Sequence, residues 1–231
     1  MNTNNGSLPD YIRDAVDSPR RPDVDKERDE IRKIAQLMVF FDIQLGQRVA
    51  DLMASRGYIA GLLAEIVGAD GIVYSQNSEA LLNRFKGKNP ITKRIETHGL
   101  TNMVAVTAEL EEIGFPEPLD VMFSFMFYHD TVWVGTDRAR MNAAIFQALK
   151  PGGIFAVVDH HTKPGAGVGQ AQELHRIERQ AVVDEAMAAG FELEDESDLL
   201  ENPDDPLEAM VFDKSIKDHT HKFVLKFRRP A

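Results

Sequence analysis

Residues 48–67 read RVADLMASRGYIAGLLAEIV, and this stretch decides the fold that we expect for the chain. Residues 48–53 carry the apolar run of a buried strand. Residues 58–67 place apolar side chains three and four positions apart, as on one face of a helix. A strand that passes through a short loop into a helix is the building unit of parallel sheets. The stretch therefore predicts an α/β fold.

The same alternation of strands and helices continues along the chain. Further strands are expected at residues 72–75, 103–106, 120–124, 154–158, 191–193 and 222–227. Further helices are expected at residues 31–41, 79–85, 138–149 and 174–189. Because parallel strands need crossover connections, this alternation predicts a Rossmann-like, doubly wound and mainly parallel sheet. The continuous apolar run at residues 121–123 is typical of a strand that is covered on both faces.

Composition narrows the range of partners and chemistries. The 231 residues suit one large domain or two small ones. The chain has 26 basic and 37 acidic residues, a net charge of −11, and an acidic surface repels phosphate backbones. We therefore expect no nucleic-acid partner. The chain has no cysteine, which excludes disulfides, thiolate metal ligands and a cysteine nucleophile.

Two segments stand apart from the alternating pattern. Residues 1–22 are rich in Asn, Gly, Pro and Ser, so we expect an irregular segment there and a single domain over residues 23–231. Residues 192–213 contain ten acidic residues and no basic one. This second segment is interpreted as a solvated hairpin between the last strands, with a cation-binding or lid role as the alternative.

No segment has the features of a membrane anchor or a secretory signal. The longest apolar-rich runs, at residues 37–41 and 121–128, are far shorter than the roughly 20 residues of a spanning helix. Residues 1–33 are polar and charged, unlike a signal peptide. We expect no membrane contact and a cytoplasmic location, and a mature exported form remains an alternative.

The loop after the first strand carries a resemblance to a known family. In doubly wound sheets, ligands bind at the carboxyl ends of the strands. There the sequence resembles the class I S-adenosylmethionine-dependent methyltransferases, which carry an acidic residue followed by glycines at alternate positions. Asp51 occupies the acidic position and Gly57 fits the last glycine, whereas Met53 and Ser55 stand where the first two glycines are expected. The match implies S-adenosylmethionine as cofactor, with binding that is weak or lost.

Later parts of the chain extend the resemblance from about residue 24 to residue 229. Residues 149–159 resemble the family's turn from a helix into the fifth strand, and residues 186–193 resemble its later turn from helix to strand. Residues 223–227 resemble its last strand, which is antiparallel. The resemblance therefore implies a seven-stranded sheet, mostly parallel with an antiparallel last strand.

The resemblance also implies which residues contact the cofactor. In the family, the acidic residue anchors the methionine amino group, and the end of the second strand holds the ribose. Gln76 and Asn77 stand at that strand end without the usual charge, and an ordinary strand-end turn is the alternative. Ala108 and Glu109 stand where the family contacts the adenine edge. The implied cofactor site consists of Asp51, Met53, Ser55, Gly57, Tyr58, Gln76, Asn77, Ala108, Glu109 and Ser124.

A narrower resemblance rests on five short motifs. They resemble a bacterial branch of predicted methyltransferases, some of which are exported, although in that branch the first loop is usually glycine-rich. The motifs are Tyr128-His129-Asp130, Asp159-His160, Leu174-His175-Arg176-Ile177, Glu196-Ser197-Asp198-Leu199-Leu200 and Val211-Phe212-Asp213.

The histidines form a second candidate group. We expect the fold to bring His129, His160 and His175 to the rim where strands end, with Asp130 and Asp159 nearby. A histidine beside a carboxylate can act as a general base near neutral pH. Structural hydrogen bonds and a divalent metal are the alternatives, and the sequence alone leads us to assign no metal site. The candidate catalytic residues are His129, Asp130, His160 and His175.

Three functions are compatible with these patterns. The first is a methyltransferase that uses S-adenosylmethionine on a small molecule, which the bulk of the motifs favours. The second is a non-catalytic protein of the same fold that has lost the cofactor and binds a ligand or partner, which residues 53–56 favour. A nicotinamide oxidoreductase is disfavoured because the chain lacks its Gly-x-Gly-x-x-Gly loop. A homodimer is the expected assembly.

Overall fold

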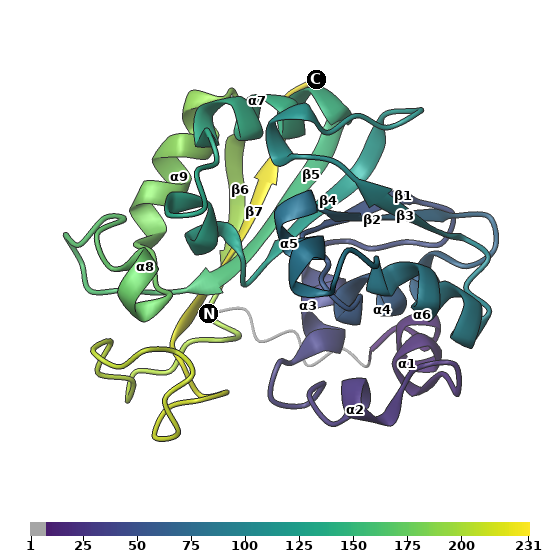
Figure 1. Cartoon of the computed structure of the whole chain (residues 1–231), viewed down its shortest axis with the longest axis horizontal. Helices are drawn as coiled ribbons and strands as arrows, with labels where there is room; N and C mark the ends of the chain where they lie inside the picture. Colours follow the sequence, from purple (N-terminus) through teal and green to yellow (C-terminus); the bar gives the residue numbers. More distant parts are fainter. Residues whose placement is uncertain (1–7) are drawn as a thin grey trace.

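A computed structural model describes residues 8–231, and over this range the strands form a seven-stranded sheet in the order β3-β2-β1-β4-β5-β7-β6 (Figure 1). The first five strands in this order run parallel, and β7 is antiparallel to both of its neighbours. The sheet confirms the predicted fold class. Its strands are β1 (Arg48–Leu52), β2 (Ile72–Asn77), β3 (Met103–Thr107), β4 (Leu119–Phe125), β5 (Leu149–His160), β6 (Glu192–Ser197) and β7 (Lys222–Arg228).

Helices cover both faces of the sheet. One buried apolar cluster joins α1, α3, α4 and α6 to one face, and a second joins α7 and α9 to the other. Figure 1 shows these two groups on opposite sides of the strands. The helices are α1 (Asp10–Asp17), α2 (Asp23–Lys26), α3 (Ile34–Phe40), α4 (Tyr58–Val67), α5 (Glu79–Arg84), α6 (Pro90–His98), α7 (Arg138–Ala148), α8 (Ala171–Leu174) and α9 (Arg179–Ala188), with 3-10 turns η1 (Leu110–Glu112) and η2 (Tyr128–Val132).

The central strands are buried on both faces, as their continuous apolar sequence predicted. Side chains of β4 alternate between the two clusters: Val121 and Phe123 pack toward α4, and Met122 packs toward α7. Burying an apolar side chain of this size stabilises the fold by about 1.5–3 kcal/mol. The core therefore fixes the ends of β1, β2 and β4, from which the candidate site is built.

The amino-terminal segment corrects one expectation. Residues 1–7 lie outside the described range, but Asp10–Asp17 forms helix α1 within the segment that was expected to be irregular. Ile12 and Ala15 are buried against the first cluster, and the Tyr11 hydroxyl donates to the carbonyl of Ile43 at 2.9 Å. Residues 10–17 are therefore an integral layer of the domain.

The region between β5 and β7 also differs from the expected helix at residues 174–189. The chain turns at His175, whose φ of 54° lies in the left-handed region, so α8 ends at Leu174 and α9 begins only at Arg179. The acidic segment is partly strand β6 and partly a loop. The buried side chain of Arg176 holds this loop in place, because its guanidinium donates to the carboxylate of Asp205 at 2.9 and 3.2 Å.

Helices long and apolar enough to cross a membrane are absent from residues 8–231.

Candidate functional site

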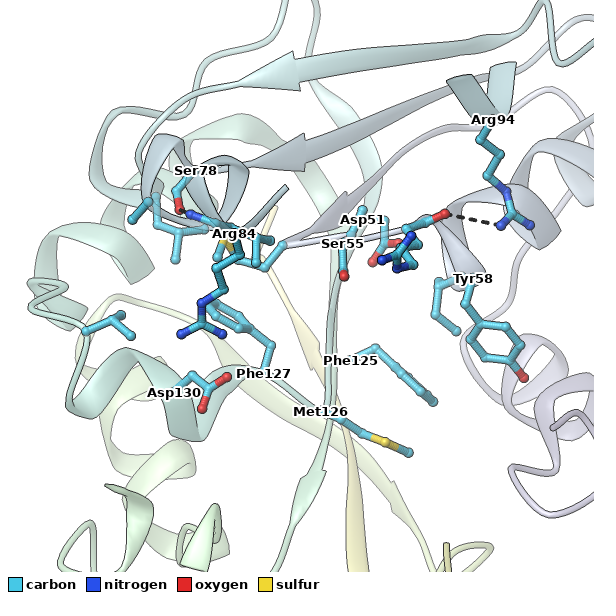
Figure 2. Close-up of a pocket in the computed structure, with 18 of the residues that line it drawn as sticks. Asp51, Ser55, Tyr58, Ser78, Arg84, Arg94, Phe125, Met126, Phe127 and Asp130 are labelled. Atoms are coloured by element: carbon cyan, nitrogen blue, oxygen red, sulfur yellow. Dashed lines mark hydrogen bonds between the residues drawn. The ribbon is translucent and has the colours of Figure 1, made fainter. Parts of the chain in front are cut away.

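A cavity of about 790 Å³ opens at the carboxyl ends of β1, β2 and β4 (Figure 2). This is the edge at which doubly wound sheets bind ligands. Its walls come from the loop after β1, the start of α5, the end of β4, the segment around α2 and residues 130–136. Figure 2 shows Asp51 and Ser55 on one wall, with Phe125, Met126 and Phe127 facing them from the end of β4. The cavity is large enough for a cofactor together with a small molecule.

The loop after β1 follows a left-handed path at alternate residues. The φ angles of Met53, Ser55 and Gly57 are 49°, 53° and 81°. A side chain makes this conformation costly by roughly 1–2 kcal/mol per residue, so it is normally left to glycine. A Cβ at Gly57 would also lie 2.9 Å from the terminal Cδ1 of Ile91, so that side chain would have to shift. Met53 and Ser55 thus adopt a backbone conformation that glycine adopts more easily.

Two buried amide side chains hold this strained loop in place. The backbone N–H of Met53 donates to Gln76 Oε1 at 2.9 Å, and that of Ser55 donates to Asn77 Oδ1 at 2.8 Å. Gln76 Nε2 in turn donates to the carbonyl of Ala108 at 2.6 Å. Gln76 and Asn77 are fully buried and do not line the cavity. They support the loop, and a ribose contact from either one stays a prediction.

Asp51 lies beneath the loop at the cavity wall. It is 3% exposed, and its carboxylate accepts the backbone N–H of Ala60 at 3.0 Å. Burial raises the pKa of Asp51 to about 7, although the hydrogen bond from Ala60 and the charge of Arg94 act in the opposite direction. A cationic group of a ligand beside this carboxylate would restore its ordinary ionisation. Asp51 is therefore suited to bind an ammonium group.

Arginines line the cavity of this acidic protein. Arg28 and Arg94 both pair with Asp25. The guanidinium carbon of Arg32 lies 4.7 Å from the ring centroid of Tyr58. Within residues 8–231, neither Arg32 nor Arg84 has a carboxylate oxygen within 4.0 Å. Figure 2 shows Arg84 on the same side of the cavity as Asp130. Within residues 8–231, the cavity thus offers two guanidinium groups, those of Arg32 and Arg84, that form no ion pair at contact distance.

His129 and His175 of the predicted histidine group form a compact cluster with Asp130 and Asp159 beside the cavity. His129 Nδ1 is 2.7 Å from Asp159 Oδ1, and His129 Nε2 is 3.2 Å from both His175 Nδ1 and Asp130 Oδ1. Burial would lower the pKa of His129, but the charge of Asp159 and hydrogen bonds to Asp130 and Asp159 outweigh it and raise the pKa to about 10. A ring that is already protonated at pH 7 cannot accept another proton. This disfavours a general-base role in the ligand-free protein.

His160 points away from this cluster. Its Nδ1 is 2.8 Å from the hydroxyl of Thr220, and its ring centroid lies 5.8 Å from that of His129. Burial, helped by the charge of Lys222, holds the pKa of His160 well below its usual value. His160 is therefore a neutral, buried hydrogen-bonding group, and any catalytic part for it stays a prediction.

The structure brings only part of the predicted site into the cavity. The residues in its lining are Asp51, Met53, Ser55, Tyr58, Glu109 and Asp130. The predicted residues outside its lining are Gly57, Gln76, Asn77, Ala108, Ser124, His129, His160 and His175. Sequence reasoning missed Arg32 and Arg84 because an arginine on an amphipathic helix is usually solvated. It also missed Met126, whose φ of 54° has no signature in the sequence.

Comparisons with known proteins agree with this architecture. No family model matches the chain. The chain is 26% identical over 151 residues to the ubiquinone/menaquinone biosynthesis C-methyltransferase UbiE of Proteus mirabilis, covering 62% of this chain and 57% of that relative. A S-adenosylmethionine-dependent methyltransferase from Aquifex aeolicus has a TM-score of 0.60 at 16% identity, covering 87% of this chain and 97% of the other. The [4+2]-cyclase SpnF has a TM-score of 0.63 at 16% identity, covering 87% and 81%.

These likenesses establish the fold. The chain has the fold of class I S-adenosylmethionine-dependent methyltransferases, as the strand, loop and helix around Asp51 predicted. The match to UbiE spans less than two thirds of that relative. The solved structures are too distant in sequence to carry a reaction, and one of them is named as a cyclase. The reaction has to be argued from the site itself.

Proposed function

We propose that the protein is a S-adenosylmethionine-dependent methyltransferase that acts on a small molecule. One observation carries the proposal: a cavity of about 790 Å³ lies at the carboxyl ends of the central strands, above a loop that keeps the glycine-type backbone at Met53 and Ser55. Asp51 at its wall suits the amino group of the cofactor. When bound, S-adenosylmethionine supplies an electrophilic methyl group. The residues of this chain then have to hold the acceptor in line and exclude water.

The acceptor that fits the cavity carries a negative charge. Burial lowers the pKa of Arg32 although Tyr58 and Asp218 act in the opposite direction, so the protein compensates its desolvated charge only in part. A carboxylate or phosphate of the acceptor would supply that compensation with a charge-assisted hydrogen bond. The apolar ends of the cavity, formed by Phe125 and Phe127, suit the body of a small organic molecule. A screen for acceptors should begin with small aromatic acids and phosphates.

Calorimetric titration with S-adenosylmethionine and S-adenosylhomocysteine tests the proposal directly. We expect saturable binding of both ligands at one site per chain. We also expect the affinity to be weaker than a glycine-rich loop would give, because the Met53 side chain lies at the cavity wall. If neither ligand binds at millimolar concentration, the protein is not a methyltransferase that uses this cofactor.

Replacing Met53 and Ser55 with glycine should tighten cofactor binding. Both residues already adopt the left-handed conformation, so glycine leaves the loop path unchanged while it removes the side chains from the cavity. Each recovered backbone contact is worth about 1 kcal/mol, or roughly five- to tenfold in affinity. The measurement is calorimetric titration of the double variant Met53→Gly, Ser55→Gly. Ala54→Gly is the control, because φ of Ala54 is not positive. Equal affinity in all three proteins would contradict this account of the loop.

Cofactor affinity should rise with pH through about 7. The pKa of Asp51 is raised by burial to about 7, so below that value its carboxyl is neutral and must lose a proton to pair with the cofactor's ammonium group. The affinity should fall by up to about tenfold per pH unit below 7 and level off above it. Titrations between pH 5.5 and 8 measure this slope. In Asp51→Asn the slope should vanish and binding should stay weak throughout. A wild-type affinity independent of pH would show that Asp51 does not bind the ammonium group.

A non-catalytic protein of the same fold is the second candidate. The observation that favours it is that the backbone N–H groups of Met53 and Ser55 already donate to Gln76 Oε1 and Asn77 Oδ1, so neither is free to bind a cofactor. In this case the cavity would bind an anionic ligand without S-adenosylmethionine. This candidate would be selected if S-adenosylmethionine bound neither wild type nor the double glycine variant, while a small acid bound to the protein. The homodimer and the cytoplasmic location stay predictions.

A further inference from the structure

Three metal-binding atoms converge beside the cavity, apart from the residues that the proposed cofactor site needs. His129 and Asp130 lie in η2, and His175 lies at the turn after α8. His129 Nε2 is 3.2 Å from Asp130 Oδ1 and 3.2 Å from His175 Nδ1, and the last two atoms are 3.1 Å apart. The three atoms therefore form a nearly equilateral triangle.

The size of this triangle matches the coordination shell of one divalent cation. When ligands lie about 2.1 Å from a first-row cation, neighbouring ligands are separated by about 3.0 Å in an octahedral shell and about 3.4 Å in a tetrahedral one. The separations of 3.1 and 3.2 Å fall between these two values. These separations are the ones expected between three ligands of one such cation.

The chemistry of the three ligands also suits such a cation. Two imidazole nitrogens with one carboxylate oxygen are common ligands of zinc, iron and manganese, whereas calcium and magnesium prefer oxygen alone. Three protein ligands leave at least one position open for water or an oxygen of a bound molecule. Asp130 lines the cavity, so the cluster adjoins the space in which the acceptor is proposed to bind.

A buried carboxylate orients one of the ligands from behind. Asp159 is 0% exposed, and its Oδ1 lies 2.7 Å from His129 Nδ1. Asp159 also accepts the backbone N–H groups of His129 at 2.8 Å and His160 at 2.7 Å. Since a carboxylate only accepts, a neutral His129 carries its proton on Nδ1 and directs the lone pair of Nε2 into the triangle. Histidine ligands of metals are held by a carboxylate in this way.

The backbone conformation and two neighbouring rings fix the position of His175. Its φ of 54° lies in the left-handed region, which few residues other than glycine adopt. The rings of Trp133 and Phe212 pack edge-on against it, with centroids 5.9 and 5.2 Å away. The side chains of His175 and Asp130 are still 21% and 25% exposed, so an ion can reach the cluster from solvent.

We propose that His129, Asp130 and His175 bind one first-row divalent cation, with Asp159 holding His129 in place. This site goes beyond the proposed methyl transfer, because it uses none of the residues around the loop after β1. A cation there would polarise an oxygen of a molecule bound in the cavity and make its hydroxyl easier to ionise.

Cobalt titration tests the site without any use of S-adenosylmethionine. Protein purified without an affinity tag is stripped with a chelator and titrated with Co²⁺, and binding is followed by visible absorption and by calorimetry. We expect saturation at one Co²⁺ per chain, with displacement by Zn²⁺. Asp130→Asn and His175→Asn should weaken binding at least tenfold, and Asp159→Asn should weaken it tenfold to a hundredfold. His161→Asn is the control, because its ring faces His221 instead of the cluster.

The results separate the possible outcomes cleanly. The proposal would be overturned if the folded wild type showed no saturable Co²⁺ binding. It would also be overturned if wild type, Asp130→Asn and His175→Asn bound Co²⁺ equally. The cluster would then be held by hydrogen bonds alone. Circular dichroism on each variant checks folding. If a variant does not fold, the stoichiometry and absorption of wild type beside His161→Asn decide the question. Failure of the metal site leaves the proposed methyl transfer intact, since the two tests share no ligand.

Discussion

Replacing Arg176 with alanine is expected to lower the free energy of unfolding by about 3–5 kcal/mol, the usual effect of removing one partner from a buried ion pair. The side chains of Arg176 and Asp205 are both 0% exposed. The guanidinium also donates to the carbonyls of Ala209 and His161, each at 3.0 Å. Alanine would leave the buried Asp205 carboxylate without its cation, with only the backbone N–H groups of Leu207 and His221 as donors, and would leave two carbonyls without this donor.

Chemical denaturation of three variants measures this effect. Arg179→Ala is the matched control, because Arg179 pairs with Glu196 at 2.7 Å on the surface, where side-chain exposures are 27% and 57%. Its loss should cost less than about 1 kcal/mol. The double variant Arg176→Met, Asp205→Leu should recover part of the stability, since no charge is left unpaired. If Arg176→Ala costs no more than Arg179→Ala, the pair does not anchor the loop between β6 and β7.

Replacing His129 with alanine is expected to lower methyl-transfer turnover by about 10²-fold, the effect of misplacing a bound reactant, because the protonated ring is suited to orient the acceptor and not to accept its proton. The ring lies at the centre of the cluster, where it contacts Asp159, Asp130 and His175 at once. Alanine also removes the partner of a buried carboxylate, which should cost about 1–3 kcal/mol of stability. Turnover is measured as release of S-adenosylhomocysteine with an acceptor found in the screen for small acids.

A second variant distinguishes a role of His129 in turnover from a purely structural role in the loop after β4. His129→Asn can keep an N–H near the position of Nδ1, and so can keep the bond to Asp159, but it has no atom in place of Nε2. We expect the melting temperature of His129→Asn to be closer to that of wild type than the melting temperature of His129→Ala is. We expect its turnover to be as low as that of His129→Ala. His161→Asn should behave as wild type. Full activity in His129→Asn would show that His129 only braces the loop after β4.

The fold could be predicted from sequence wherever local and long-range signals agree. The expected helix at residues 58–67 coincides with α4 because its apolar face lies between Gly57 and Gly68, which both have positive φ. Helix α1 was missed because its stability depends on burying Ile12 against a cluster that is distant in sequence. A short helix of this kind has little stability of its own in water.

The candidate site could be predicted in position but not in orientation. Parallel strands place His129, His160 and Asp51 at the same edge, and the topology alone gives that result. It does not determine that His160 turns toward Thr220, or that Asn77 turns under the loop toward Ser55. Side-chain directions at strand ends depend on loops whose paths are fixed by tertiary contacts. For this reason the fold was predicted correctly, but only some of the residues predicted for the site line the cavity.

The outer edge of the sheet limits how two copies of this chain could associate. Within residues 8–231, strand β6 lies at the end of the sheet and pairs with β7 alone. Its sequence carries Glu192, Glu194, Asp195 and Glu196, all four of them exposed. A two-fold axis that joined two β6 strands would set these carboxylates against one another, and like charges on facing strands repel. Edge-to-edge pairing of two copies through β6 is therefore disfavoured, even though Glu194 and Glu196 form ion pairs within the chain.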